Sequence, residues 1–411
     1  MECRRALKAA FRTRGFVPYR EAESYARRVH RAIDGLEALL DAGRADGVLE
    51  LCELAIDKVP DAMASMDDSD GHMGLVLMRI EGLHQRAAAR CTLDSSRLAE
   101  RLLRLVLETE YGFEDGIEAY VSRLGETGMT VYRRLAEAEW ETIPGLGPGD
   151  DRYDASYDKR FRITAVMEEL ARLSRDLEAL VQVKARDLST AYDFLEIAEI
   201  YLEAGDHNGA LTWAERGVAS FPPDRDLRLR DLVAREYQRL ARDLEAVAVI
   251  WEAYEAWPGL EAYSRLKGIG EPAGVWPDTR ERALARLRQA TETRQDPSEL
   301  VRVLLWDGDV QTAWEEARRG GCARGLWFEL AAALERDSPD AALEIYEVQL
   351  RATFGRRGID SYDEVVELMR KIQRLMQRLG RGAEFAELAG AVRAEHRRKR
   401  NLIKLLDAEG W

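Results

Sequence analysis

The chain has 411 residues, 46% of them apolar and 33% charged, and its formal net charge is −14. This composition excludes wholesale disorder, and the negative balance argues against a general nucleic-acid binder that relies on phosphate contacts. No stretch approaches the roughly 18 apolar residues that cross a bilayer. No apolar targeting segment follows the basic first residues, and the four cysteines form no CxxC pair, so we expect a cytoplasmic protein with reduced thiols.

Straight-chain residues and alanine dominate, and strand-like alternation is rare, which favours helices throughout. Residues 1–141 are expected to form an irregular N-terminal helical domain. Pro- and Gly-rich residues 142–158 interrupt the helical pattern and are expected to form a linker or loop. Residues 159–411 are expected to form a helical-repeat domain, with a second break at 267–278.

The clearest organisation is a tandem repeat of two helix pairs, expected at 191–224 and 227–260. The spacing of large and small residues in the first pair recurs 36 residues later in the second. Small residues let antiparallel helices approach closely, and a proline after the second helix of each pair stops it. Arg230 stands where this pattern normally has a large apolar residue. The repeat-defining positions are Phe194, Ile197, Ala198, Tyr201, Ala210, Gly217, Pro222, Val233, Ala234, Tyr237, Ala246, Ile250, Ala253 and Pro258.

These spacings are those of tetratricopeptide repeats. The sequence therefore predicts an all-α fold, an α-solenoid of antiparallel helix pairs that follows the irregular N-terminal region. Weaker helix-pair patterns continue to the end of the chain, and three tryptophans, Trp306, Trp314 and Trp327, cluster among them. We interpret these tryptophans as packing anchors, with partner-binding residues as the alternative.

Few patterns indicate chemistry. The five histidines form no HExxH motif and have no cysteine at metal-ligand spacing. The acidic run of Asp67, Asp68 and Asp70 does not fit a calcium loop, because Met66 and Leu77 would occupy its ligand positions. It is interpreted as a capped turn, with a carboxylate cluster as the alternative. We predict no catalytic, cofactor-binding or metal-binding residues.

Both ends of the chain are basic although the whole is acidic. Residues 1–20 hold six Arg and Lys against one Glu, and residues 393–404 hold the same balance. Within the second segment, a possible partner-binding basic patch is formed by Arg397, Arg398, Lys399 and Arg400. A terminal cap of the repeat array, contact with an acidic protein, and contact with nucleic acid or a membrane surface remain alternatives for this segment.

Three further stretches carry a resemblance: Gly15 to Arg20, Met66 to Gly71, and His396 to Leu402. With the helical pattern between them, the chain resembles an uncharacterised bacterial helical-repeat family whose members often follow a SWIM-type zinc finger. The SWIM pattern, CxC followed by CxH, is absent from this sequence. The resemblance therefore implies the helical region alone and carries no known activity.

The predicted function is a non-catalytic protein–protein interaction scaffold that binds a partner on the concave surface of its repeats. One alternative is a nucleic-acid-associated protein that uses its basic termini. A weaker one is a metal-assisted hydrolase that uses Asp67, Asp68 and Asp70 with a distant histidine. The sequence leaves the partner and the oligomeric state open.

Overall fold

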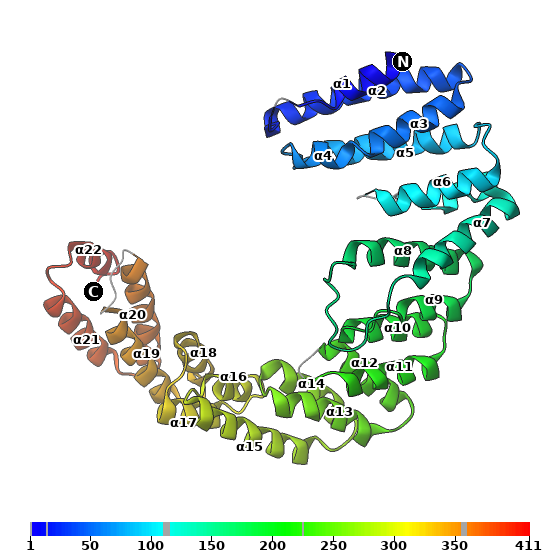
Figure 1. Cartoon of the computed structure of the whole chain (residues 1–411). Coiled ribbons are helices and arrows are strands. Elements are labelled where there is room, and N and C mark those ends of the chain that lie inside the picture. Colours follow the sequence, from blue (N-terminus) through cyan, green and yellow to red (C-terminus); the bar gives the residue numbers. More distant parts are fainter. Residues whose placement is uncertain (1, 14, 110–115, 224–225, 355–359) are drawn as a thin grey trace. The chain divides into compact units, whose positions relative to one another are not determined.

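The computed structural model describes every residue except 1, 14, 110–115, 224–225 and 355–359, and only the backbone of 360 and 361. Contacts between Cα atoms group the chain into two compact units, residues 1–221 and 222–411. Across the described residues the regular structure is α-helical apart from one 3-10 turn and two isolated β-bridges, and consecutive helices pack as antiparallel pairs (Figure 1). The predicted all-α fold of tetratricopeptide-like helix pairs is confirmed.

The first unit buries a continuous apolar core that extends from Leu7 in its first helix to Val183. Helices α6 and α7 form one tight pair, and α10 and α11 form another. The helices of this unit are α1 (Glu2–Ala10), α2 (Tyr19–Asp41), α3 (Ala45–Ile56), α4 (Val59–Ala64), α5 (His72–Ala88), α6 (Ser95–Glu108), η1 (Glu118–Tyr120), α7 (Val121–Glu141), α8 (Tyr157–Ser174), α9 (Leu177–Lys184), α10 (Ala191–Glu203) and α11 (His207–Ser220).

The second unit has its own core, which extends from Ala234 to Leu406. The final residue, Trp411, packs edge-on against Phe385 with a ring-centroid distance of 5.4 Å. The helices of this unit are α12 (Leu227–Arg239), α13 (Asp243–Ala256), α14 (Leu260–Gly270), α15 (Trp276–Arg294), α16 (Ser298–Trp306), α17 (Val310–Gly320), α18 (Arg324–Leu334), α19 (Pro339–Phe354), α20 (Asp360–Arg378), α21 (Gly382–Glu395) and α22 (Arg400–Ala408).

The two repeats of the sequence correspond to the pairs α10–α11 and α12–α13. Every repeat-defining position is buried except Tyr237, which is half-buried, and Pro222, which is exposed. Arg230, the departure from the pattern, is also buried. Its guanidinium donates hydrogen bonds to the carbonyl of Val249 at 3.0 Å and to the carboxylate of Glu252 at 2.8 Å. A charged side chain thus occupies a core position by taking its hydrogen-bond partners from the second helix of the pair.

Both expected breaks are turns between helices inside a compact unit. Residues 142–158 connect α7 to α8 within the first unit, and 267–278 covers the end of α14 and the start of α15 within the second. Pro277 lies in the first turn of α15, where its missing N–H costs little. The division between the two compact units follows Phe221, directly after α11. No helix in the described residues has the length and apolar content needed to cross a membrane.

Candidate functional site: an aromatic groove in the first unit

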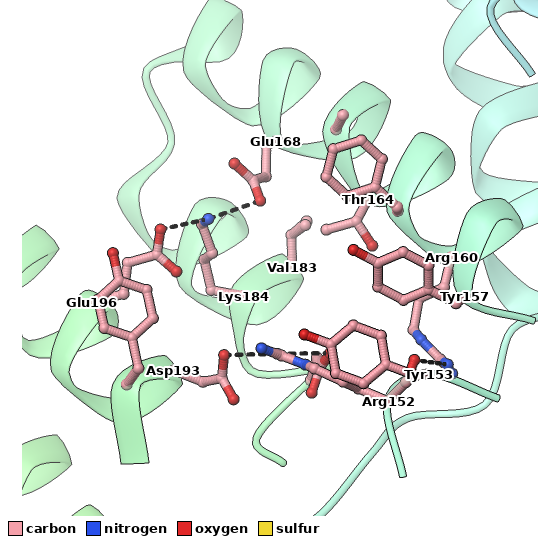
Figure 2. Close-up of a pocket in the computed structure, with 14 residues that line it drawn as sticks. Arg152, Tyr153, Tyr157, Arg160, Thr164, Glu168, Val183, Lys184, Asp193 and Glu196 are labelled. Atoms are coloured by element: carbon pink, nitrogen blue, oxygen red, sulfur yellow. Dashed lines mark hydrogen bonds and ion pairs between the residues drawn. The ribbon is translucent and has the colours of Figure 1, made fainter. Parts of the chain in front are cut away.

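A groove with a volume of about 420 Å³ lies in the first unit. Its walls come from the first half of α8, the end of α9, the start of α10 and the loop that precedes α8 (Figure 2). Helices α8 and α10 each begin a helix pair, so the groove lies between consecutive repeats. Side chains of two chemical kinds line it, aromatic rings and ion pairs.

The aromatic rings form a row along the start of α8. Tyr153 and Tyr157 have ring centroids 5.1 Å apart, and Phe161 follows at 6.3 Å from Tyr157. Tyr153 lies in the loop that precedes α8, and Tyr157 and Phe161 are four apart in α8, a spacing that puts side chains on one face of a helix. Their exposed fractions are 74%, 37% and 65%, and Tyr192 of α10 adds a fourth ring, which is 44% exposed. The groove is therefore edged by aromatic surface that the fold does not cover.

Lys184, the last residue of α9, lies between two carboxylates (Figure 2). Its Nζ is 2.8 Å from Glu168 of α8 and 2.9 Å from Glu196 of α10. Burial opposes the charge of Lys184, but these two hydrogen bonds outweigh it, so the pKa of the amine is raised. One lysine thus connects three helices of the groove.

Arg152, in the loop before α8, lies between two other carboxylates. Its Nη2 is 2.9 Å from Asp187 and 2.8 Å from Asp193. Burial opposes the charge of Arg152, but both hydrogen bonds favour it, so its pKa is raised. Burial likewise opposes the charge of Asp187, yet hydrogen bonds from Ser189 and Arg152 hold its pKa below its usual range. Asp193 also accepts the N–H of Thr190 at 2.7 Å, which caps α10.

Backbone hydrogen bonds attach the loop 142–158 to the segment that follows α9. Leu146 donates its N–H to the carbonyl of Arg186 at 2.7 Å, and Leu188 donates to the carbonyl of Leu146 at 2.8 Å. The side chain of Arg186 donates to the carbonyl of Ile143 at 3.1 Å and to that of Trp140 at 3.0 Å, and it stacks on the Trp140 ring. These bonds place Arg152 and Tyr153 at the edge of the groove.

Comparison with protein families places this architecture in a known group. The family model described as "Family of unknown function (DUF6880)" matches residues 1–262. The chain belongs to the DUF6880 family. The matched part of this DUF6880 chain includes the groove and both clear repeats, and it ends at the start of α14. A search of curated proteins found no match to this chain.

Solved structures similar to the DUF6880 chain include one whose title names a TPR domain and one whose title names a tandem repeat protein. "Crystal Structure of P58(IPK) TPR Domain at 2.5 A" is 11% identical, covers 92% of this chain and 95% of that chain, and has a TM-score of 0.22. "Circular tandem repeat protein with novel repeat topology and enhanced subunit contact surfaces" is 14% identical, covers 100% and 98%, and has a TM-score of 0.19. "Crystal structure of APC/C hetero-tetramer Cut9-Hcn1" is 14% identical, covers 90% and 91%, and has a TM-score of 0.21. At these TM-scores the likenesses carry no functional argument.

The basic patch of the DUF6880 chain covers the turn after α21 and the first residue of α22. Arg397, Arg398 and Arg400 are exposed. Lys399 instead turns toward the second unit's own helices, where its Nζ donates to the carbonyl of Phe354 at 3.2 Å and lies 5.6 Å from the centre of that ring. The exposed part of the patch is therefore three arginines rather than four basic residues.

The acidic run precedes α5. Asp68 accepts the N–H of Met73 in the first turn of that helix at 3.0 Å, and Asp67 accepts the hydroxyl of Ser69 at 2.5 Å. His72 is the histidine beside the run, with its Nε2 3.8 Å from Asp70. Within the described residues, no three His, Cys, Asp or Glu side chains gather as a metal-binding group. Asp67 and Asp68 thus accept hydrogen bonds from groups of the turn itself and of the first turn of α5.

The groove was not predicted from the sequence, although the sequence carries one signal of it. Tyr153, Tyr157 and Phe161 recur every four residues directly after a Pro- and Gly-rich loop, a pattern typical of an aromatic stripe on a helix. The ion pairs had no such signal, since Arg152 lies 41 residues before Asp193. Only the packing of α8 against α9 and of α9 against α10 brings these charges together.

Proposed function

We propose that this protein is a non-catalytic scaffold that binds an extended segment of a partner protein in the groove of α8, α9 and α10. The observation that carries the proposal is the row of exposed rings, Tyr153, Tyr157 and Phe161, beside the hollow of the groove. A bacterial origin, a cytoplasmic location and a link to SWIM-type zinc fingers remain predictions.

Exposed aromatic rings favour a protein ligand. Aromatic side chains bury a large area at a low cost in conformational entropy, and they dominate the energetics of protein interfaces. A small-molecule site normally encloses 70–90% of its ligand, whereas two of these rings are themselves more than half exposed. An extended peptide that lies along the row and covers the rings fits this surface better than a compact ligand.

The charged groups of the groove support binding rather than proton transfer. A general acid or base works best when its pKa lies near the working pH. The pKa values of Arg152 and Lys184 are raised and that of Asp187 is lowered, so all three stay charged at neutral pH. Each is also held by hydrogen bonds to neighbouring side chains.

The test is a selection of random twelve-residue peptides on the full-length protein, followed by calorimetric titration of the selected peptides. We expect binding at one peptide per chain and a loss of at least tenfold in affinity in a Tyr157→Ala, Phe161→Ala double variant, because buried aromatic anchors contribute about 1–2 kcal/mol or more each. The matched control is Phe16→Ala, which removes a ring of 68% exposure elsewhere in the first unit.

Circular dichroism of both variants establishes that their helices are intact. If the selected peptides bind the double variant as well as the unmodified protein, or if Phe16→Ala weakens them equally, the groove is not the binding site.

A further inference from the structure

We infer that the groove selects a basic segment, one that presents lysine or arginine side chains to the aromatic row. This inference rests on the proposed function and specifies the chemistry of the partner. It follows from the charge balance of the groove and from the kind of surface beside those charges.

The first part of the charge balance is the cluster around Lys184. One ammonium group contacts two carboxylates, those of Glu168 and Glu196, and Glu168 also pairs with Arg172 at 2.8 Å, so the cluster is formally neutral. The side chain of Glu196 is 35% exposed and that of Glu168 is 13% exposed. The carboxylate of this cluster that a ligand can reach is therefore mainly Glu196, on the α10 side of the groove.

The second part is the cluster around Arg152. One guanidinium contacts Asp187 and Asp193, which gives this cluster a formal charge of −1. The third lining cation, Arg160, is paired with Asp154 at 2.6 Å and adds no surplus. The paired groups of the groove thus sum to about one negative charge at neutral pH, and every lining cation is already neutralised.

The aromatic row supplies the complementary half of a cation site. A lysine or arginine can lay its apolar stem on exposed rings and place its charge over a ring face, within about 6 Å of the centroid. Tyr153, Tyr157, Phe161 and Tyr192 line the same hollow as the surplus carboxylates. A basic side chain gains from both surfaces, whereas an acidic one meets net repulsion and a neutral one gains from the rings alone.

The net charge of the chain acts in the same direction. A formal charge of −14 attracts a basic segment over distances comparable with the Debye length and raises its association rate at low ionic strength. Nucleic acid, whose bases also stack on aromatic rings, is repelled by the same field. The observations therefore favour a basic protein segment over an oligonucleotide.

The experiment measures fluorescence polarisation with three labelled twelve-residue peptides of one Gly- and Pro-containing background. Four alternate positions hold arginine, glutamine or glutamate, and an oligothymidine of similar length is a fourth probe. We expect the arginine peptide to bind at least tenfold more tightly than the glutamine peptide. We expect no measurable binding of the glutamate peptide or the oligonucleotide, and a several-fold loss of arginine-peptide affinity between 50 and 300 mM salt.

A charge-neutralising pair of variants localises the effect. Glu196→Gln removes one accessible negative charge from the groove while Lys184 keeps Glu168, and it should weaken the arginine peptide several-fold without changing the glutamine peptide. Glu199→Gln is the control, because Glu199 is an exposed residue of the same helix that does not line the groove. Equal effects of the two variants, or tighter binding of the oligonucleotide, would overturn the inference.

The outcomes separate this inference from the proposed function. If the glutamine peptide binds as tightly as the arginine peptide, and both lose affinity in the Tyr157→Ala, Phe161→Ala variant, the scaffold function stands and the preference for a basic partner is wrong. If neither peptide nor any selected peptide depends on the two rings, both proposals fail.

Discussion

Gly209 lies in the first turn of α11, facing the helix with which α11 is paired. A Cβ atom at this position would lie 2.6 Å from Cδ1 of Tyr201 and 2.8 Å from Oδ2 of Asp206. Neither obstacle is free to move, since the Tyr201 hydroxyl donates to Glu178 at 3.1 Å and Asp206 accepts the N–H of Gly209 at 2.9 Å. The substitution Gly209→Ala therefore forces α10 and α11 apart or displaces a buried ring.

Two opposing terms set the size of the effect. Overpacking a closely packed site costs about 1–3 kcal/mol, while replacing a helical glycine with alanine contributes about 0.5–1 kcal/mol of stability. We expect Gly209→Ala to lower the free energy of unfolding by about 1 kcal/mol. The assay is urea unfolding of the full chain followed by circular dichroism, with the midpoint and slope fitted separately.

Gly74 is the matched control, because it occupies the equivalent third position of α5 in the same compact unit. Apart from its chain neighbours and the backbone of its own helix, no heavy atom of the described residues lies within 4 Å of a Cβ placed there. Gly74→Ala should therefore raise stability by up to about 1 kcal/mol. If Gly209→Ala stabilised the protein as much as Gly74→Ala, the close approach of α10 and α11 at Tyr201 would be refuted. A smaller cost of Gly209→Ala in a Tyr201→Leu background would identify the ring as its cause.

Three other perturbations should change the free energy of unfolding, and they differ in the direction of the change. Arg230→Met should be neutral or stabilising by up to about 2 kcal/mol in thermal unfolding, because it removes the desolvation cost of a buried guanidinium and leaves Glu252, whose side chain is 57% exposed, in contact with water. A loss of more than 2 kcal/mol would show that the contact with Glu252 is essential. Arg186→Ala removes hydrogen bonds to the carbonyls of Trp140, at the end of α7, and Ile143, in the loop before α8. It should cost about 2–3 kcal/mol in urea unfolding, whereas an unchanged midpoint would mean that Leu146 and its backbone bonds suffice. Burial lowers the pKa of His84 although Glu53 opposes this, so protonation favours the unfolded chain and stability should fall as the pH drops below about 6.5, by at most about 1.4 kcal/mol per pH unit. A His84→Gln variant should have a shallower loss between pH 7.5 and 5.5, and parallel slopes would contradict this assignment.

Much of the fold was predictable because its signal is local. The spacing of Ala198, Ala210 and Ala246 reports where helices must cross closely, and Pro258 follows the end of α13. These features depend on residues near one another in the chain. Helix α1 was not predicted, because its short amphipathic pattern is masked by basic residues, and only packing of Leu7 in the core identifies its buried face.

The groove was less predictable because its signals combine local and distant residues. The i, i+4 spacing of the aromatic row indicates a shared helix face, but not whether the face is buried or exposed. That distinction depends on which surface of α8 packs against α7 and α9. The clusters of Lys184 and Arg152 join α8, α9, α10 and the preceding loop, and a list of common charged residues does not reveal such combinations.

The manner in which the loop before α8 is attached has a consequence for how the protein can diversify. Its main anchors are backbone bonds at Leu146 and Leu188 and the side chain of Arg186, whereas the rim of the groove is formed by the side chains at 153 and 157. The residues that attach the loop are thus different from the residues that a ligand would contact at the rim of the groove. Substitutions at the rim can be selected for new ligands, in evolution or in a designed library, while the attachment of the loop stays intact.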